Sequence, residues 1–175
     1  IIEVGLRDGL QSEETLIPTE KKLDIIARLV DAGVKRLQVT SFVHPKYVPQ
    51  MADAEDLCTG LVPQDGVEYS GLVLNMKGLE RAHRAGLRAV DMGMSASDTH
   101  SRKNTGMGID EKKPEFAEMI AKSRDFGFSV RAGLQCVFGC VYEGCVPEDR
   151  IYGLIHFILD QGIDELSLAD STGMA

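Results

Sequence analysis

The chain has 175 residues, of which 43% are hydrophobic and 26% charged, with 18 glycines and no tryptophan. This ordinary globular composition excludes collagen-like, low-complexity and disordered chains. The 19 Lys and Arg against 27 Asp and Glu give a net charge of −8. Because no basic stripe offsets that charge, we expect no nucleic-acid binding. No apolar run approaches the ~20 residues of a membrane span, so we expect no membrane insertion.

Short apolar segments alternate with helical segments along the whole chain. Six of them are predicted to be strands: Ile1–Leu6, Leu37–Ser41, Val67–Leu74, Ala89–Met94, Phe128–Leu134 and Glu165–Ala169. A glycine closes a helical stretch and precedes each of the last five: Gly33, Gly66, Gly86, Gly127 and Gly162. Glycine is the usual left-handed residue after a helix, so this recurrence predicts helix ends at these positions.

Two of the intervening helices are marked by apolar residues on one face. Helix Glu20–Ala32 follows Thr19, a predicted N-cap, and helix Glu148–Gln161 repeats the same apolar spacing. Pro114 and Pro147 are predicted in the first turns of two later helices.

Apolar strands alternating with helices predict an α/β fold with a parallel sheet. A doubly wound sheet and a (β/α)8 TIM barrel both fit. The first strand is followed by Arg7-Asp8-Gly9 rather than a glycine-rich phosphate turn, and polar residues gather after the strands, which favours the barrel. A barrel takes ~250 residues. We therefore expect residues 1–175 to form a single, incomplete TIM-barrel catalytic domain that covers strands one to six.

Two acidic segments follow predicted strands. Asp8, beside Arg7, could bind a metal ion next to a cation that stabilises negative charge, or the two residues could form a solvated ion pair. Asp170, in Asp170-Ser171-Thr172-Gly173, could face the same rim or cap a following helix.

The remaining polar residues can be explained either by a function or by structure alone. Ser95–Gly108 is interpreted as a substrate loop in which Arg102 and Lys103 meet anionic groups, although a plain surface loop would look the same. His100 is expected to be a solvated loop residue. Gln38, inside a strand, must find hydrogen-bond partners. The four cysteines, Cys58, Cys136, Cys140 and Cys145, lack zinc-pair spacing and are predicted to be small buried thiols in a reducing compartment.

Several segments resemble the hydroxymethylglutaryl-CoA lyase family. They are Val4–Gln11, Thr40–Asp53, Ser95-Ala96-Ser97 with Ser101-Arg102-Lys103-Asn104, Tyr142-Glu143-Gly144, and Leu168–Gly173. The resemblance runs over essentially the whole chain in the same order, and Leu10-Gln11 favours the lyase branch over the related synthases. It implies a metal-dependent cleavage of a hydroxyacyl-CoA, in which a tertiary alcohol loses its proton and a carbon–carbon bond breaks to give a ketone and an acetyl-CoA enolate.

The resemblance also assigns roles to residues. Asp8 would bind Mg2+ or Mn2+, Arg7 would neutralise the enolate oxygen, and Asp170 would help proton transfer or orient the hydroxyl. The residues expected to contact the acyl-CoA substrate or lie near it are Gln11, Gln38, Ser41, Arg102, Lys103, Asn104, Arg131 and Tyr142.

Two departures from the family leave alternatives open. The family's other metal ligands and its catalytic cysteine loop would lie beyond Ala175, so we expect these 175 residues alone to be inactive and to bind metal weakly. Gln38 stands where these lyases have a glutamate, which leaves open a lyase or synthase for another hydroxyacyl-CoA, or an inactive homologue.

No leader is visible, but one could have been removed, so its absence says little about location. We expect a cytoplasmic location, or the mitochondrial matrix if a leader has been removed. A homodimer is one assembly to test.

Overall fold

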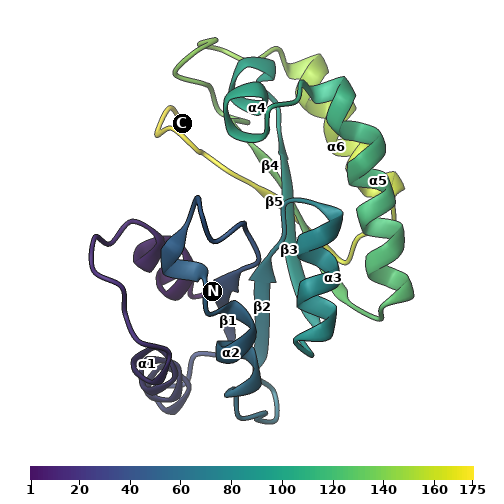
Figure 1. Cartoon of the computed structure of the whole chain (residues 1–175). Helices are drawn as coiled ribbons and strands as arrows, with labels where there is room; N and C mark the ends of the chain where they lie inside the picture. The colour runs from purple at the N-terminus through teal and green to yellow at the C-terminus, as the bar shows by residue number, and fades with distance from the viewer. The chain divides into compact units, whose positions relative to one another are not determined.

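The computed structural model describes residues 1–175 as an alternation of helices and strands (Figure 1). In chain order the elements are the π-helical turn η1 (Gly5–Gly9), α1 (Thr19–Asp31), β1 (Arg36–Ser41), the 3-10 turn η2 (Pro49–Met51), α2 (Ala54–Thr59), β2 (Glu68–Leu72), α3 (Met76–Arg84), β3 (Ala89–Ser95), α4 (Asp98–Thr105), α5 (Ile109–Asp125), β4 (Ser129–Gln135), α6 (Glu148–Asp160) and β5 (Glu165–Leu168). The chain divides into two compact units, Ile1–Asp91 and Met92–Ala175.

The strands form a sheet in the order β1-β2-β3-β4-β5. The pairings of β1 with β2, β2 with β3 and β4 with β5 are parallel, as a chain of βα units requires. The register of β1 against β2 shifts between Gln38 and Thr40, which places a β-bulge in β1. The parallel sheet with intervening helices confirms the predicted α/β class.

The prediction of a strand over Ile1–Leu6 is wrong. Only Glu3 pairs there, through a parallel bridge to Leu37, and the π-helical turn begins two residues later at Gly5. Five strands therefore stand where six were predicted. The apolar residues that suggested a strand have another role, because Leu6 is buried within the turn.

The glycine pattern is confirmed at four of the five positions, and some helix boundaries are corrected. Gly33, Gly86, Gly127 and Gly162 follow helix ends with positive φ. Gly66 also has a positive φ but ends no helix, because α2 ends at Thr59. Pro18, not Thr19, is the N-cap of α1. Pro147 caps α6, whereas Pro114 lies inside α5, beyond its first turn. Ser95–Gly108 is not a plain loop, since it contains α4, which Ser97 caps and left-handed Gly106 ends.

Both units contain buried apolar residues. In the first unit, Leu6, Ile26, Val30, Leu37, Val39 and Leu57 form one buried cluster. In the second, Val130, Ala132 and Leu134 are buried at alternate positions of β4, while α5 and α6 contribute Phe116, Ile120, Leu154 and Ile158 to the buried core. None of the helices combines the length and apolar character needed to cross a bilayer.

Candidate active site

The π-helical turn η1 presents Arg7 and Asp8. Its defining bond runs from the Leu10 N–H to the Gly5 carbonyl, five residues back. Leu6 is buried in the core of the first unit and so fixes the backbone from which Arg7 and Asp8 project. Arg7 Nη1 lies 2.6 Å from Asp8 Oδ1, and the Asp8 side chain is 65% exposed. Single π-helical turns often occur at functional sites, and this one holds both residues predicted to do chemistry.

Arg7 also reaches a buried polar network on the sheet. Its Nε donates to Gln38 Oε1, and Gln38 Nε2 donates to Asp91 Oδ2. Ser70 Oγ donates to the same Asp91 oxygen at 2.6 Å. Gln38 is therefore buried with partners on both sides of its amide, which confirms that it must find hydrogen bonds.

A divalent ion would find one carboxylate ligand in the first unit. Asp8 shares only Oδ1 with Arg7, which leaves Oδ2 able to coordinate a hard cation. No group of three or more His, Cys, Asp or Glu side chains is placed to hold a metal ion. The donor set therefore fits Asp8 as a single contributor to a metal shell, and not as the centre of a complete one.

Ser41 is an unsatisfied polar residue at the end of β1. Its Oγ is buried and is the one buried side-chain polar atom without a hydrogen-bond partner. Buried hydroxyl groups are normally satisfied, so an unpartnered one at the carboxyl end of a parallel strand supports a role in ligand binding.

In the second unit, hydrogen bonds join the start of α4 to the segment after β3 and to the segment after β4. Ser97 Oγ accepts from the His100 N–H, and the Thr99 N–H donates to Glu143 Oε1 at 2.6 Å. Burial acts to raise the pKa of Glu143, but the hydrogen bonds from Thr99, Ser97 and Arg150 hold it below its usual value. His100 is half-buried with Nδ1 3.1 Å from Ser95 Oγ, so the prediction of a solvated loop histidine is wrong.

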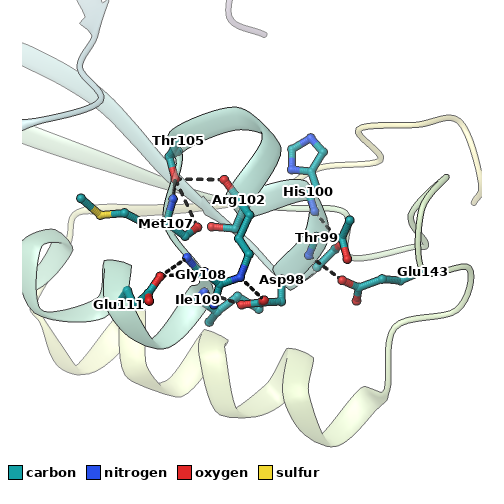
Figure 2. Close-up of polar contacts among 12 residues, drawn as sticks. Asp98, Thr99, His100, Arg102, Thr105, Met107, Gly108, Ile109, Glu111 and Glu143 are labelled. Atoms are coloured by element: carbon teal, nitrogen blue, oxygen red, sulfur yellow. Dashed lines mark hydrogen bonds and ion pairs between the residues drawn. The ribbon is translucent and has the colours of Figure 1, made fainter.

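Arg102 holds α4 to the start of α5 (Figure 2). Its guanidinium forms ion pairs with Asp98 on α4 at 2.8 Å and with Glu111 on α5 at 3.0 Å. Asp98 also accepts from the Ile109 N–H, and the two donors lower the pKa of Asp98, the backbone N–H most strongly. These contacts give Arg102 a structural role as a clamp between the two helices.

Two of the predicted substrate residues lie together on the second unit. Lys103 Nζ lies 4.5 Å from the ring centroid of Tyr142, close enough for a cation–π contact. Lys103, the adjacent Asn104 and Tyr142 are all exposed. They form an accessible basic and polar surface at the end of α4.

The other predicted site residues have different surroundings. Asp170 is exposed, and the N–H groups of Met174 and Ala175 donate to its carboxylate and lower its pKa. This lowered pKa makes Asp170 a weak base. Arg131 is the third residue of β4, half-buried and in register with Glu165 of β5. Gln11 lies half-buried just after η1.

The cysteines agree in part with the prediction of buried thiols. Cys58, Cys136 and Cys140 are buried, but Cys145 is exposed. Burial raises the pKa of the Cys58 thiol to about 12. Cys140 Sγ lies 3.1 Å from Ser97 Oγ. Burial acts to raise the pKa of Cys140, but hydrogen bonds from Ser97 and neighbouring groups leave it lowered.

Two polar residues of these networks were not predicted from the sequence. Asp91 is a single acidic residue within an apolar strand, and such a residue must find buried partners, so a signal was present. Glu143 lies in a segment that carries the family resemblance, but its hydrogen bonds to Thr99 of α4 and Arg150 of α6 could not be predicted, because both partners lie on other elements.

Comparison with known proteins gives one family over the whole chain. The family model described as HMGL-like matches residues 1–175. The hydroxymethylglutaryl-CoA lyase of Bacillus subtilis is 41% identical over 175 residues, which are 100% of this chain and 58% of that protein. The mitochondrial hydroxymethylglutaryl-CoA lyase of Bos taurus is 39% identical over 99% of this chain and 54% of its own length.

The solved structures that match this chain over nearly its whole length include HMG-CoA lyases. A crystal structure of the Bacillus subtilis HMG-CoA lyase superposes with a TM-score of 0.95 at 40% identity, covering 99% of this chain and 59% of that one. An HMG-CoA lyase from Acinetobacter baumannii, in complex with coenzyme A and 3-methylmalate, gives a TM-score of 0.93 at 36% identity over 99% of this chain and 57% of that one. The chain thus spans a little over half the length of these relatives, and their fold confirms the TIM-barrel assignment.

Proposed function

The chain belongs to the HMGL-like family, and on that premise we propose that the complete gene product cleaves hydroxymethylglutaryl-CoA to acetyl-CoA and acetoacetate. The observation that carries this proposal is the Arg7–Asp8 pair on a π-helical turn, which sets a cation with free N–H donors beside an exposed carboxylate. The identity of about 40% to hydroxymethylglutaryl-CoA lyases supports the choice of substrate.

The reaction needs charge control at two atoms. The tertiary hydroxyl of the substrate gives up its proton, the adjacent carbon–carbon bond breaks as the oxygen becomes a ketone, and the bond's electron pair moves to the thioester, whose enolate is then protonated on carbon. We propose Mg2+ or Mn2+ as the cofactor; when bound, the ion would polarise substrate oxygens. Asp8 would hold the ion in the first unit, and Arg7 would donate to the developing enolate oxygen.

Other residues would bind and orient the substrate. Ser41, with its unpartnered hydroxyl, would donate to a substrate acceptor. Asp170 would orient the hydroxyl rather than take its proton, because its backbone donors keep it ionised. On the second unit, Lys103 and Asn104 would contact CoA, with Tyr142 fixing Lys103. Gln11 and Arg131 stay as predicted substrate contacts, and Arg102 would serve the substrate indirectly by fixing α4.

The relatives carry names that place them in mitochondria and in the cytoplasm. We propose one of these two compartments for this protein as well, with the acyl-CoA as its small-molecule partner. Homodimer formation stays a prediction.

A panel of thioesters tests the proposed substrate. The complete gene product is incubated with Mg2+ or Mn2+ and with hydroxymethylglutaryl-CoA or other 3-hydroxyacyl-CoAs, and the products are quantified. We expect acetyl-CoA and acetoacetate in equal amounts from hydroxymethylglutaryl-CoA. Turnover of a different thioester alone would assign another lyase activity, and no turnover of any thioester would indicate an inactive homologue.

A further inference from the structure

A buried chain of hydrogen bonds runs from Arg7 through Gln38 to Asp91. Arg7 Nε donates to Gln38 Oε1, and Gln38 Nε2 donates to Asp91 Oδ2 at 2.5 Å. Gln38 is 2% exposed and Asp91 5% exposed. All three residues belong to the first unit. A buried carboxylate thus lies one amide away from the guanidinium proposed to stabilise the enolate.

The orientation of the Gln38 amide follows from its partners. A guanidinium only donates hydrogen bonds, so the amide must turn its oxygen toward Arg7. Its NH2 group then faces Asp91, whose Oδ2 accepts from it. The amide dipole is therefore aligned between a negative and a positive group, which strengthens both hydrogen bonds.

The sheet holds this chain of contacts in place. Gln38 pairs in register with Ser70 of β2, and Ser70 Oγ donates to the same Asp91 oxygen as Gln38 does. The β-bulge in β1 directly follows Gln38. Bulges re-aim side chains next to active sites, and here the bulge adjoins the residue that contacts Arg7.

Anchoring at Nε leaves the outer nitrogens of Arg7 for other partners. Nη1 bonds to Asp8, and Nη2 keeps its N–H donors. We propose that Asp91 is a positioning residue for Arg7, acting through the Gln38 amide to fix the guanidinium at the orientation the cleavage needs. This inference rests on the proposed function. It assigns the negative charge that balances Arg7 to Asp91 on β3, and not to position 38 on β1, where the side chain is a neutral amide.

An exchange of charge between the two positions tests the proposal. In the complete gene product, three variants are compared: Asp91→Asn, Gln38→Glu, and the double variant Gln38→Glu/Asp91→Asn. The double variant keeps the net charge and the number of heavy atoms, but it places the carboxylate directly on Arg7 and an amide behind it. Glu68→Gln is the matched control, since Glu68 pairs with Arg36 on the same sheet at 3.0 Å and lies outside the network.

We expect Asp91→Asn to lower kcat on hydroxymethylglutaryl-CoA by about 10–100-fold, while KM changes less than about threefold. Gln38→Glu alone should also lose activity, because it places two buried carboxylates together. The double variant should recover kcat to within about threefold of the unchanged protein, and Glu68→Gln should retain it. A purely structural role would instead lower the melting temperature without this recovery.

The proposal is overturned if Asp91→Asn keeps kcat within about twofold, or if the double variant is no better than the single ones. If the unchanged protein cleaves no hydroxymethylglutaryl-CoA, the proposed function fails, and the NMR signal of the Arg7 Nε–H decides the inference separately. We expect that signal to move upfield and exchange faster with water in Asp91→Asn, and to be restored in the double variant. An Nε–H signal unchanged by Asp91→Asn contradicts the coupling.

Discussion

An Arg7→Ala variant of the complete gene product is expected to cleave hydroxymethylglutaryl-CoA with a kcat about 10²–10³-fold below that of the unchanged protein. The side chain supplies donors to charge that develops only as the carbon–carbon bond breaks, so its loss should change kcat much more than KM. Steady-state kinetics at saturating metal would measure both constants.

The structure supplies two comparisons for this variant. Arg7→Lys keeps a positive charge but loses the planar Nε donor to Gln38, so we expect an intermediate kcat. Arg28→Ala is the surface control, because Arg28 is 76% exposed and pairs only with Asp24 on the same helix. An Arg7→Ala enzyme whose kcat stays within threefold of the unchanged protein would remove Arg7 from the reaction.

The second large effect is expected on stability. Asp53→Ala should lower the free energy of unfolding by about 3 kcal/mol, because it leaves the Lys22 ammonium buried without its counter-charge. Lys22 is 3% exposed at its side chain and lies 2.6 Å from Asp53 Oδ1. Its remaining partner is the Gln50 carbonyl at 2.7 Å. Asp53 also accepts from Thr19 Oγ1, so the variant loses the hydrogen bond between the start of α1 and the segment before α2.

Denaturant unfolding with two comparison variants isolates the cause. The double variant Lys22→Met/Asp53→Leu removes both charges and should recover most of the lost stability, since an apolar pair can replace a buried ion pair. Asp24→Ala removes an exposed helical pair with Arg28 and should cost less than about 0.5 kcal/mol. A loss below about 1 kcal/mol for Asp53→Ala would show that Lys22 reaches water or another acceptor.

Local sequence rules predicted the parts of this fold that depend on neighbouring residues. Gly33, Gly86, Gly127 and Gly162 have positive φ directly after a helix, because a left-handed residue there is a local requirement. Gly66 has a positive φ in a turn instead, seven residues after α2 ends at Thr59. The apolar strands after them are parallel, as predicted. The prediction of a strand failed at residues 1–6. Their apolar content is typical of a strand, but a π-helical turn begins at Gly5 and ends at Gly9. No periodicity distinguishes a turn of this length from a short strand.

The functional residues divide in the same way. Their position after an apolar run left Arg7 and Asp8 as either a metal site or a solvated ion pair, and the structure shows the ion pair. The resemblance to hydroxymethylglutaryl-CoA lyases, and not the local pattern, assigned their roles in the reaction. The partners that give them context are distant in sequence: Gln38 is 31 residues from Arg7, and Asp91 is 53 residues from Gln38. Arg102 was predicted to contact the substrate, which stays a prediction, and nothing in the sequence indicated that Asp98 and Glu111 would hold it between α4 and α5.

We propose that Asp8 holds a divalent ion on which the cleavage depends. The most direct measurement is the cleavage rate of the complete gene product before chelation, after exhaustive chelation and after Mg2+ or Mn2+ is returned. We predict that chelation abolishes cleavage, that the returned ion restores it, and that Asp8→Asn shifts the metal concentration for half-maximal rate upward by at least about tenfold. A rate unchanged by chelation, or a metal dependence unchanged in Asp8→Asn, would contradict the account.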